Sequence, residues 1–293
     1  MKRIILLFLI LTFVLCGCAS PEEPAQIAAT TLPVYEFTSR LCEGTGITVH
    51  RLVTEEVSCL HDYSLNVKQV KAAEAAQLIV ISGAGLESFL EGLLTDKPCI
   101  DASEGISLLC PEDAHSHEAE HHHDGHHHEE DPHIWLSPAN ARDMVTNIWS
   151  GLCRAYPQQE AVFSDNYSAL ISQLTALETY GNDQLATLWC RDLITFHDGF
   201  SYFADAFGLH ILESVEEESG SEASAKELIH LIEEVDHHRL PAIFTEKSGS
   251  TSAAGIISRE TGCEIFTLDM AMAGDRYFDA MYRNIDTIKE ALG

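Results

Sequence analysis

The chain has 293 residues, of which 46 are acidic and 17 basic, and its formal net charge is −29 at pH 7. A surface of this charge repels nucleic acid and attracts cations, so we exclude nucleic acid as a partner. The length and the hydrophobic share of 45% are enough for one large domain or two lobes with cores of their own.

The N-terminus has the pattern of a secretory signal. Two basic residues precede an apolar run over 4–15, which is too short for an ordinary spanning helix of roughly 20 apolar residues. The run continues into Leu-Cys-Gly-Cys, which resembles a bacterial lipobox, and we expect lipid on Cys18 because bulky Leu15 fits poorly before the earlier cysteine. We therefore predict a signal peptide over 1–17 and a lipidated cysteine with a tether over 18–26.

This N-terminus places the protein outside the cytoplasm. We expect it to be anchored to the bacterial membrane, at the cell surface or in the periplasm, and the alternative is a cleaved signal with no lipid. Seven cysteines lie beyond Cys18, and the odd number leaves at least one thiol unpaired or engaged elsewhere. There is no Cys-x-x-Cys pair, so a cysteine-based zinc knuckle is not expected.

The first part of the folded chain alternates short apolar runs with helical patterns. We predict strands at 27–32, 47–53 and 78–82, and helices at 35–42, 65–77 and 86–94. Strands that alternate with helices indicate a parallel sheet, so we assign an N-terminal α/β lobe to residues 27–156.

A histidine-rich segment over 111–130 interrupts this lobe and has no apolar period. Eight imidazoles within fourteen residues cannot support a core, because each is polar and titrates near neutrality. We predict a loop that collects metal ions weakly and multivalently, and a pH-sensitive solvated linker is the alternative. Its histidines are His115, His117, His121, His122, His123, His126, His127 and His128.

A long amphipathic helix is predicted over 157–188. One apolar stripe runs along it, formed by Tyr167, Leu170, Ile171, Leu174, Leu177 and Tyr180. Strand patterns then resume at 193–196, 211–215, 242–244 and 264–268, which gives a C-terminal α/β lobe over 189–293. The predicted fold class is α/β, with two lobes that each hold a mostly parallel sheet flanked by helices and a long linking helix between them.

Four potential metal ligands lie at or near the ends of predicted strands: His61, His133, His197 and Asp269. Ligands of open α/β sheets bind outside the carboxyl ends of the strands, so two facing lobes would bring these residues into an interlobe cleft. Three imidazoles and one carboxylate suit Zn²⁺, whereas a site richer in carboxylates would favour manganese. Strand-end position alone does not assign these roles, because most histidines at such places are structural.

Several sequence blocks, in order, resemble the metal-binding lipoproteins of ABC importers for zinc and manganese, the ZnuA-like (cluster A-I) solute-binding family. The resemblance runs from about Ala28 to Gly293. The blocks that carry it are 82–87 (SGAGLE), 101–106 (DASEGI), 131–136 (DPHIWL), 196–203 (FHDGFSYF) and 274–284, which begins GDRY.

This resemblance implies a rigid backbone helix between the lobes and one metal ion held between them by His61, His133, His197 and Asp269. Zinc-type members have a histidine where His197 stands and a histidine-rich loop before the second ligand, so the expected cargo is Zn²⁺ rather than Mn²⁺. It also implies an ABC permease and its ATPase as partners, a monomer held to the membrane by its lipid, and no enzymatic activity.

The segment around the first ligand departs from the family pattern. Residues 55–65 lack the usual Gly- and Pro-containing flanks, and Cys59 is a possible auxiliary ligand. Glu246 matches a recurrent family glutamate, and we expect it to support the site rather than bind the metal. The remaining histidines, His50, His210, His230, His237 and His238, are interpreted as surface or structural residues.

Three alternative functions remain. A manganese receptor of the same family would differ in its cargo. An exported zinc hydrolase would keep three protein ligands and an open water position, but the chain has no His-Glu-x-x-His helix and no evident general base. A stand-alone zinc buffer or a cell-adhesion protein of the same fold would need no importer.

Overall fold

The computed structural model describes residues 25–55, 57, 60, 63–109, 130–215, 223–247, 251–274 and 276–293. The elements of the first half are β1 (Ile27–Ala29), α2 (Leu32–Leu41), β2 (Val49–Arg51), α3 (Val67–Ala75), β3 (Leu78–Ile81), the 3₁₀ turn η1 (Ser88–Leu90), α4 (Glu91–Leu94) and β4 (Cys99–Asp101). The middle of the chain forms η3 (Ile134–Leu136), α5 (Pro138–Ala155), η4 (Pro157–Gln159) and α6 (Glu160–Leu185). The second half contains β5 (Asp192–Thr195), α7 (Ser201–Phe207), β6 (His210–Ser214), α8 (Ala225–His238), β7 (Ala242–Glu246), α9 (Ser252–Thr261), β8 (Glu264–Leu268) and α10 (Tyr277–Leu292).

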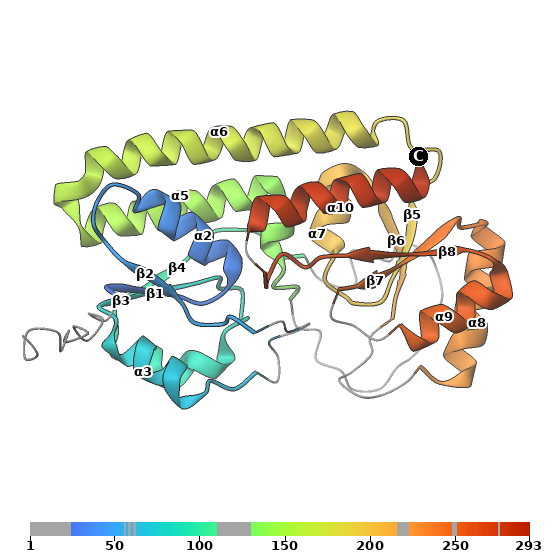
Figure 1. The fold of residues 1–293 in the computed structure, drawn as a ribbon, viewed down its shortest axis with the longest axis horizontal. Helices are drawn as coiled ribbons and strands as arrows, with labels where there is room; N and C mark the ends of the chain where they lie inside the picture. Colours follow the sequence, from blue (N-terminus) through green and yellow to red (C-terminus); the bar gives the residue numbers. More distant parts are fainter. Residues whose placement is uncertain are drawn as a thin grey trace, which may run out of the picture.

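Two four-stranded sheets with the same strand order form the framework. The first sheet has the order β2-β1-β3-β4 and the second β6-β5-β7-β8, and every pairing is parallel. The strands β1 and β7 are buried along their whole length, as expected where helices cover both faces of a parallel sheet. The predicted fold class, two α/β lobes with parallel sheets, is confirmed (Figure 1).

The order in which the chain adds strands reverses at one place in each sheet. β1 lies between β2 and β3, and β5 lies between β6 and β7, so each sheet has a switch point beside its first strand. Open α/β sheets bind ligands at such points, outside the carboxyl ends of the strands. The loops that follow β1, β3, β5 and β7 are therefore the places where a binding site is expected.

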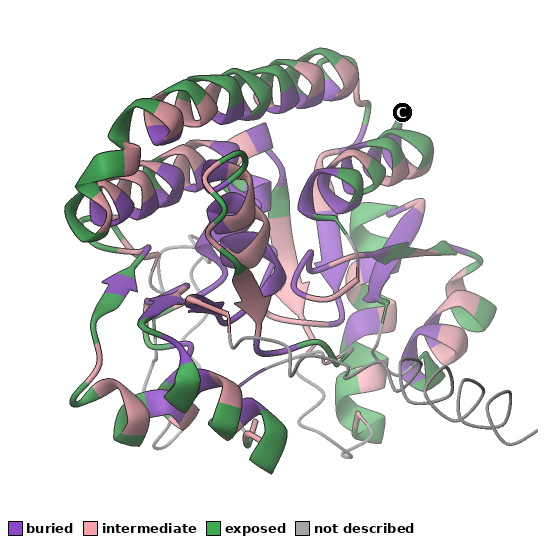
Figure 2. Cartoon of the chain, turned by 60° about the vertical axis from the view of Figure 1, so that its left-hand side comes forward, coloured by how far each residue is buried: buried purple, intermediate pink, exposed green. Residues whose placement is uncertain are grey.

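The long helix α6 packs against both halves of the molecule. It contacts α2 and α5 on one side and α7 and α10 on the other, and its 26 residues span about 39 Å (Figure 1). Phe163, Leu170, Leu174, Leu177 and Leu185 are buried, whereas the outward face is exposed (Figure 2). The helix lies within the predicted range of 157–188, whose first three residues form the separate turn η4.

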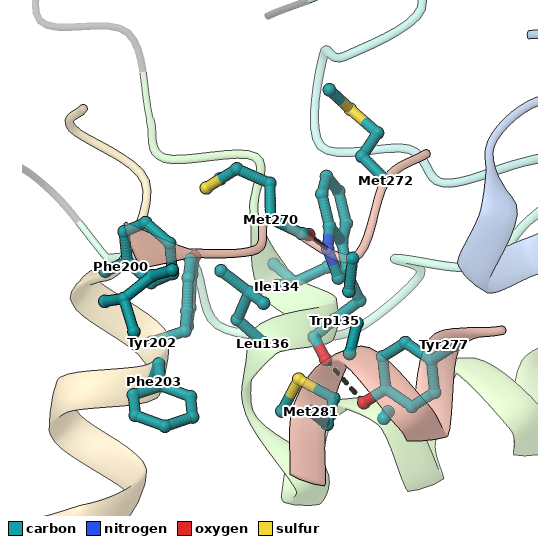
Figure 3. Packing of buried hydrophobic residues seen from close by; sticks show 14 of the residues in the cluster. Ile134, Trp135, Leu136, Phe200, Tyr202, Phe203, Met270, Met272, Tyr277 and Met281 are labelled. Carbon is teal, nitrogen blue, oxygen red and sulfur yellow. Dashed lines mark hydrogen bonds between the residues drawn. The ribbon is translucent and has the colours of Figure 1, made fainter. Parts of the chain in front are cut away.

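Hydrogen bonds tie the two halves together beneath α6. The indole Nε1 of Trp135 donates to the carbonyl of Met270 at 2.8 Å, and the Tyr277 hydroxyl donates to the carbonyl of Trp135 at 2.7 Å (Figure 3). The amide of Leu32 donates to the carbonyl of Met272 at 3.3 Å. Because Trp135 and Tyr277 are fully buried, these bonds hold the segment after β8 against η3 and the first half.

Gly181 in α6 packs closely against Phe207 of α7. A Cβ atom there would lie 2.2 Å from Cε1 of Phe207, which is buried. We expect Gly181→Ala to lower the free energy of unfolding by about 1–2 kcal/mol, because overpacking outweighs the helix preference of alanine. Gly255→Ala in α9 is the matched control, since its nearest neighbour would be Nη1 of Arg259 at 3.6 Å. Equal stability of the two variants in chemical denaturation would contradict the close packing.

We expect the free energy of unfolding to depend on pH, because the side chain of Glu87 is buried. It accepts hydrogen bonds from the Thr30 hydroxyl at 2.6 Å and the amides of Ser82 and Gly83 at 2.7 and 3.0 Å. Burial nevertheless raises the pKa of Glu87 from 4.5 to about 7. Between these values the folded state holds a proton that the unfolded state has lost, so this group's contribution to stability falls as pH rises.

We therefore expect the wild type to lose stability relative to Glu87→Gln as pH rises from 4.5 to 7. Urea denaturation at several pH values measures the difference. Glu91→Gln, at an exposed position, is the control and should follow the wild type at every pH. Parallel stability curves for Glu87→Gln and the wild type would show that the carboxylate does not titrate in this range.

Candidate metal centre

Two of the four predicted ligands, His133 and His197, come together in the structure. His133 directly precedes η3 and His197 lies two residues beyond β5, at the carboxyl end of that strand. Their ring centroids are 5.3 Å apart and their planes are inclined by 82°. Residues from the two halves of the chain therefore place two imidazoles side by side at the switch point of the second sheet.

The environment of His133 is the one expected of a metal ligand. Its ring is 2% exposed, and Nδ1 lies 2.7 Å from Oδ1 of Asp131, which also accepts the His133 backbone amide at 2.9 Å. A carboxylate at Nδ1 favours the tautomer with the proton there, which leaves a lone pair on Nε2. This Nε2 atom is buried and has no hydrogen-bond partner among the described residues.

His197 also has an acidic residue beside it, as His133 has Asp131. Nδ1 of His197 is 4.0 Å from Oε2 of Glu246, the buried last residue of β7, the strand next to β5. The hydroxyl of Thr195 donates to the backbone carbonyl of His197 at 3.1 Å and fixes the turn after the strand. This distance is too long for the hydrogen bond that Asp131 makes with His133, but it places a buried carboxylate on the Nδ1 side of His197.

Gly199, which was not singled out from the sequence, lies against both imidazoles. A Cβ atom at this position would lie 2.5 Å from Cε of Met270, 2.8 Å from Cδ2 of His197 and 3.1 Å from Cε1 of His133. The turn after β5 therefore needs a residue without a side chain so that both imidazoles can lie against its backbone. The only signal in the sequence is its place within the block His-Asp-Gly-Phe.

Asp269 directly follows β8, and its carboxylate is held by neighbouring groups. The buried side chain of Asn284 bonds the Asp269 amide at 2.8 Å and the Asp269 carbonyl at 2.7 Å. Oδ1 accepts the amide of Ala271 at 2.9 Å, and Oδ2 lies 3.2 Å from Nη2 of Arg283.

The structure does not join Asp269 to the two histidines in one ligand cluster. Within the described ranges, one group of three His, Cys, Asp or Glu residues has its ligand atoms within 4.8 Å of one another. That group is Glu234, His237 and His238 on α8, and it does not include Asp269. The carboxylate of Asp269 is instead turned to the amide of Ala271 and to Arg283.

The other predicted residues lie outside the described part of the chain. These are His61, the possible auxiliary ligand Cys59, the lipidation site Cys18, and the loop histidines His115, His117, His121, His122, His123, His126, His127 and His128. No helix in the described ranges is both long and apolar enough to cross a membrane. The five described cysteines, Cys42, Cys99, Cys153, Cys190 and Cys263, are free thiols.

The described residues on either side of the histidine-rich segment are joined by hydrogen bonds. The amide of Asp131 donates to the carbonyl of Leu109 at 3.2 Å, which brings the two flanks together. The Tyr202 hydroxyl in α7 accepts the amide of Leu109 at 2.9 Å and donates to the carbonyl of Asp131 at 3.0 Å. Because Asp131 also contacts the ring of His133, the base of this segment lies next to the histidine pair.

Comparison with known proteins finds relatives that cover nearly the whole chain. The chain is 30% identical over 307 residues to the zinc-binding lipoprotein AdcA of Streptococcus pneumoniae serotype 4, over 99% of this chain. It spans 61% of that protein, or about three fifths of its length. A putative metal-binding protein of Treponema pallidum is 28% identical, over 94% of this chain and 92% of that protein.

Solved structures have the same fold. A crystal structure of ZnuA superposes with a TM-score of 0.77 at 26% identity, covering 92% of this chain and all 100% of that one. The Zn(II)-bound ZnuA-like domain of AdcA from Streptococcus pneumoniae has a TM-score of 0.75 at 26% identity, covering 91% and 98%. The family model described as zinc-uptake complex component A, periplasmic, matches residues 27–291. The chain therefore belongs to the zinc-uptake complex component A family.

Proposed function

We propose that this protein captures Zn²⁺ outside the cytoplasm and delivers it to an ABC-type importer. The observation that carries the proposal is the buried pair of imidazoles, in which a carboxylate lies beside Nδ1 of His133 and leaves Nε2 without a partner among the described residues. Carboxylate–imidazole–metal order is the usual arrangement of zinc-binding histidines. AdcA, a relative, is named as a zinc-binding lipoprotein.

In this proposal His133 and His197 bind the ion through imidazole nitrogen, and His61 and Asp269 complete a tetrahedral set. Oδ2 of Asp269 contacts Arg283 at 3.2 Å, and metal binding would weaken or replace this contact. The Arg283 side chain is 60% exposed, and exposed ion pairs contribute only about 0–1 kcal/mol, so exchanging this contact for a metal bond costs little. Three nitrogen ligands favour Zn²⁺ over Mn²⁺, which prefers oxygen.

The cellular setting follows from the N-terminus and the family. We infer that lipid on Cys18 holds a monomer at the outer side of the membrane, where a permease and its ATPase accept the ion. The family is one of uptake components, so we assign this chain to transport rather than to an exported zinc hydrolase.

Elemental analysis of protein purified without added metal tests the choice of ion. About one zinc per chain is expected, and manganese in its place would contradict the zinc assignment. Zinc uptake by cells that lack the gene, with and without the wild-type gene restored, tests delivery. Unchanged uptake in zinc-poor medium would favour a buffer or an adhesin.

Deleting residues 111–130 tests whether the histidine-rich segment binds zinc weakly and independently of the tight site. Leu109 and Asp131 are already hydrogen-bonded, so a short glycine linker can close the gap. We expect the deletion to leave one tight zinc site, because the proposed ligands lie outside it, and to remove the weak sites. Calorimetric titration of both proteins measures this. Loss of tight binding would show that the site lies in the deleted segment.

A further inference from the structure

A second group of metal-binding side chains lies at the end of α8. Glu234, His237 and His238 each offer one ligand atom, and these atoms all lie within 4.8 Å of one another. Residues spaced by three and four along a helix lie on the same face, which explains why the three side chains converge. Within the described ranges this is the one place where three such residues come together.

The ring of His238 lies between two carboxylates. Nε2 is 3.4 Å from Oε2 of Glu234, and Nδ1 is 3.8 Å from Oδ2 of Asp192, the first residue of β5. Oδ1 of Asp192 is in turn 3.2 Å from Nδ1 of His210. A carboxylate at Nδ1 leaves Nε2 to bind a metal. Asp131 lies in the same way beside Nδ1 of His133, and the contact at His238 is longer.

The group lies near the amino ends of the strands of the second sheet, whereas His197 lies at their carboxyl ends. Asp192 and His210 begin β5 and β6, whereas His197 and Glu246 stand at the carboxyl ends of β5 and β7. The helix α8 is on the right of Figure 1, away from the first half. His237 and His238 are the last residues of α8, where the helix dipole and the unpaired carbonyls favour a cation.

We propose that Glu234, His237 and His238 form a second, weaker site for a divalent transition-metal ion such as Zn²⁺, in which Asp192 orients His238 and water completes the coordination. A tetrahedral ion with bonds of about 2.1 Å holds its ligand atoms about 3.4 Å apart, which is the present distance between His238 and Glu234. The side chains of His238 and Glu234 are 31% and 26% exposed, so the site is open to solvent and loads without movement of the two halves. The proposal does not depend on the zinc site assigned to His133 and His197.

Histidine footprinting of the full chain tests this site residue by residue. The intact protein is titrated with Zn²⁺, treated with diethyl pyrocarbonate, and analysed by mass spectrometry, so that signals from other histidines are separated. We expect His237 and His238 to become protected only after the tight site is filled. His230, on the same helix and 54% exposed, is the internal control and should keep its reactivity.

Two variants locate the ligands. Glu234→Gln should raise the zinc concentration for half-protection of His238 at least about 10-fold, and Asp192→Asn should raise it about 10-fold by loosening the ring. Binding at the tight site should be unchanged in both, which separates this proposal from the function proposed above. If His237 and His238 react at the same rate with and without zinc, or if Glu234→Gln leaves their protection unchanged, the second site does not exist.

Discussion

Replacing His197 by alanine is expected to weaken tight zinc binding by about 100- to 1000-fold. A four-ligand zinc site contributes about 10–16 kcal/mol, so each ligand accounts for about 2.5–4 kcal/mol. His133→Ala should have an effect of the same size, because the two rings face one ion in the proposed site. Competition with a chelator of known zinc affinity measures both constants.

His50→Ala is the matched control for these variants. His50 lies in β2, a strand of the first sheet, and has no place in the proposed ligand set. Its zinc affinity should equal that of the wild type. If His197→Ala also bound zinc as the wild type does, within about threefold, the imidazole pair would not be the metal site.

Gly199→Ala is expected to weaken zinc binding by about 10- to 100-fold while the metal-free protein stays folded. The new Cβ would lie 2.8 Å from Cδ2 of His197 and 3.1 Å from Cε1 of His133, so both rings must shift. Distances from zinc to its ligands vary by only about 0.2 Å. Changing the groups that position the ligands typically lowers metal affinity by about 10- to 100-fold. The third close atom is Cε of Met270, the end of a flexible side chain that can move aside.

Gly92→Ala provides the comparison, because a Cβ there would meet no atom within 4 Å. Zinc affinity and the melting temperature of the metal-free protein are measured for both variants. Gly199→Ala should differ from Gly92→Ala chiefly in affinity. Wild-type affinity in Gly199→Ala would mean that the turn after β5 does not set the position of the two rings.

Much of the fold could be predicted because each element carries its own pattern. The run Leu78–Ile81 is a buried strand in the structure, and the apolar stripe of α6 packs inward as its spacing requires. The strand β4 was not predicted, because three residues of alternating exposure give no pattern. The helix α5 was also missed, although Ser137 before Pro138 is a start signal and accepts the amide of Asn140 at 3.4 Å.

The site could be predicted in part, for a topological reason. In parallel sheets the carboxyl ends of strands meet at one edge, so His197 and Asp269 could be chosen as candidates from their strand-end positions, although position alone does not assign their roles. The roles of Asp131, Glu246 and Gly199 depend on distances between segments far apart in the chain, which periodicity does not contain.

The histidines at the end of α8 illustrate the same limit. His237 and His238 were interpreted as surface or structural residues, because nothing nearby in the chain suggests Asp192 as a neighbour. Only the folded chain brings the end of α8 to the start of β5, where that carboxylate lies 3.8 Å from His238.

The most direct test of the zinc site is anomalous diffraction at the zinc absorption edge from crystals of the full chain loaded with one equivalent of Zn²⁺. The result expected is a single strong peak bonded to Nε2 of His133 and to the ring of His197, at about 2.0–2.1 Å, with His61 and Asp269 as the other ligands. A single ion bound elsewhere, with neither His133 nor His197 among its ligands, would contradict the proposed site and the transport function built on it.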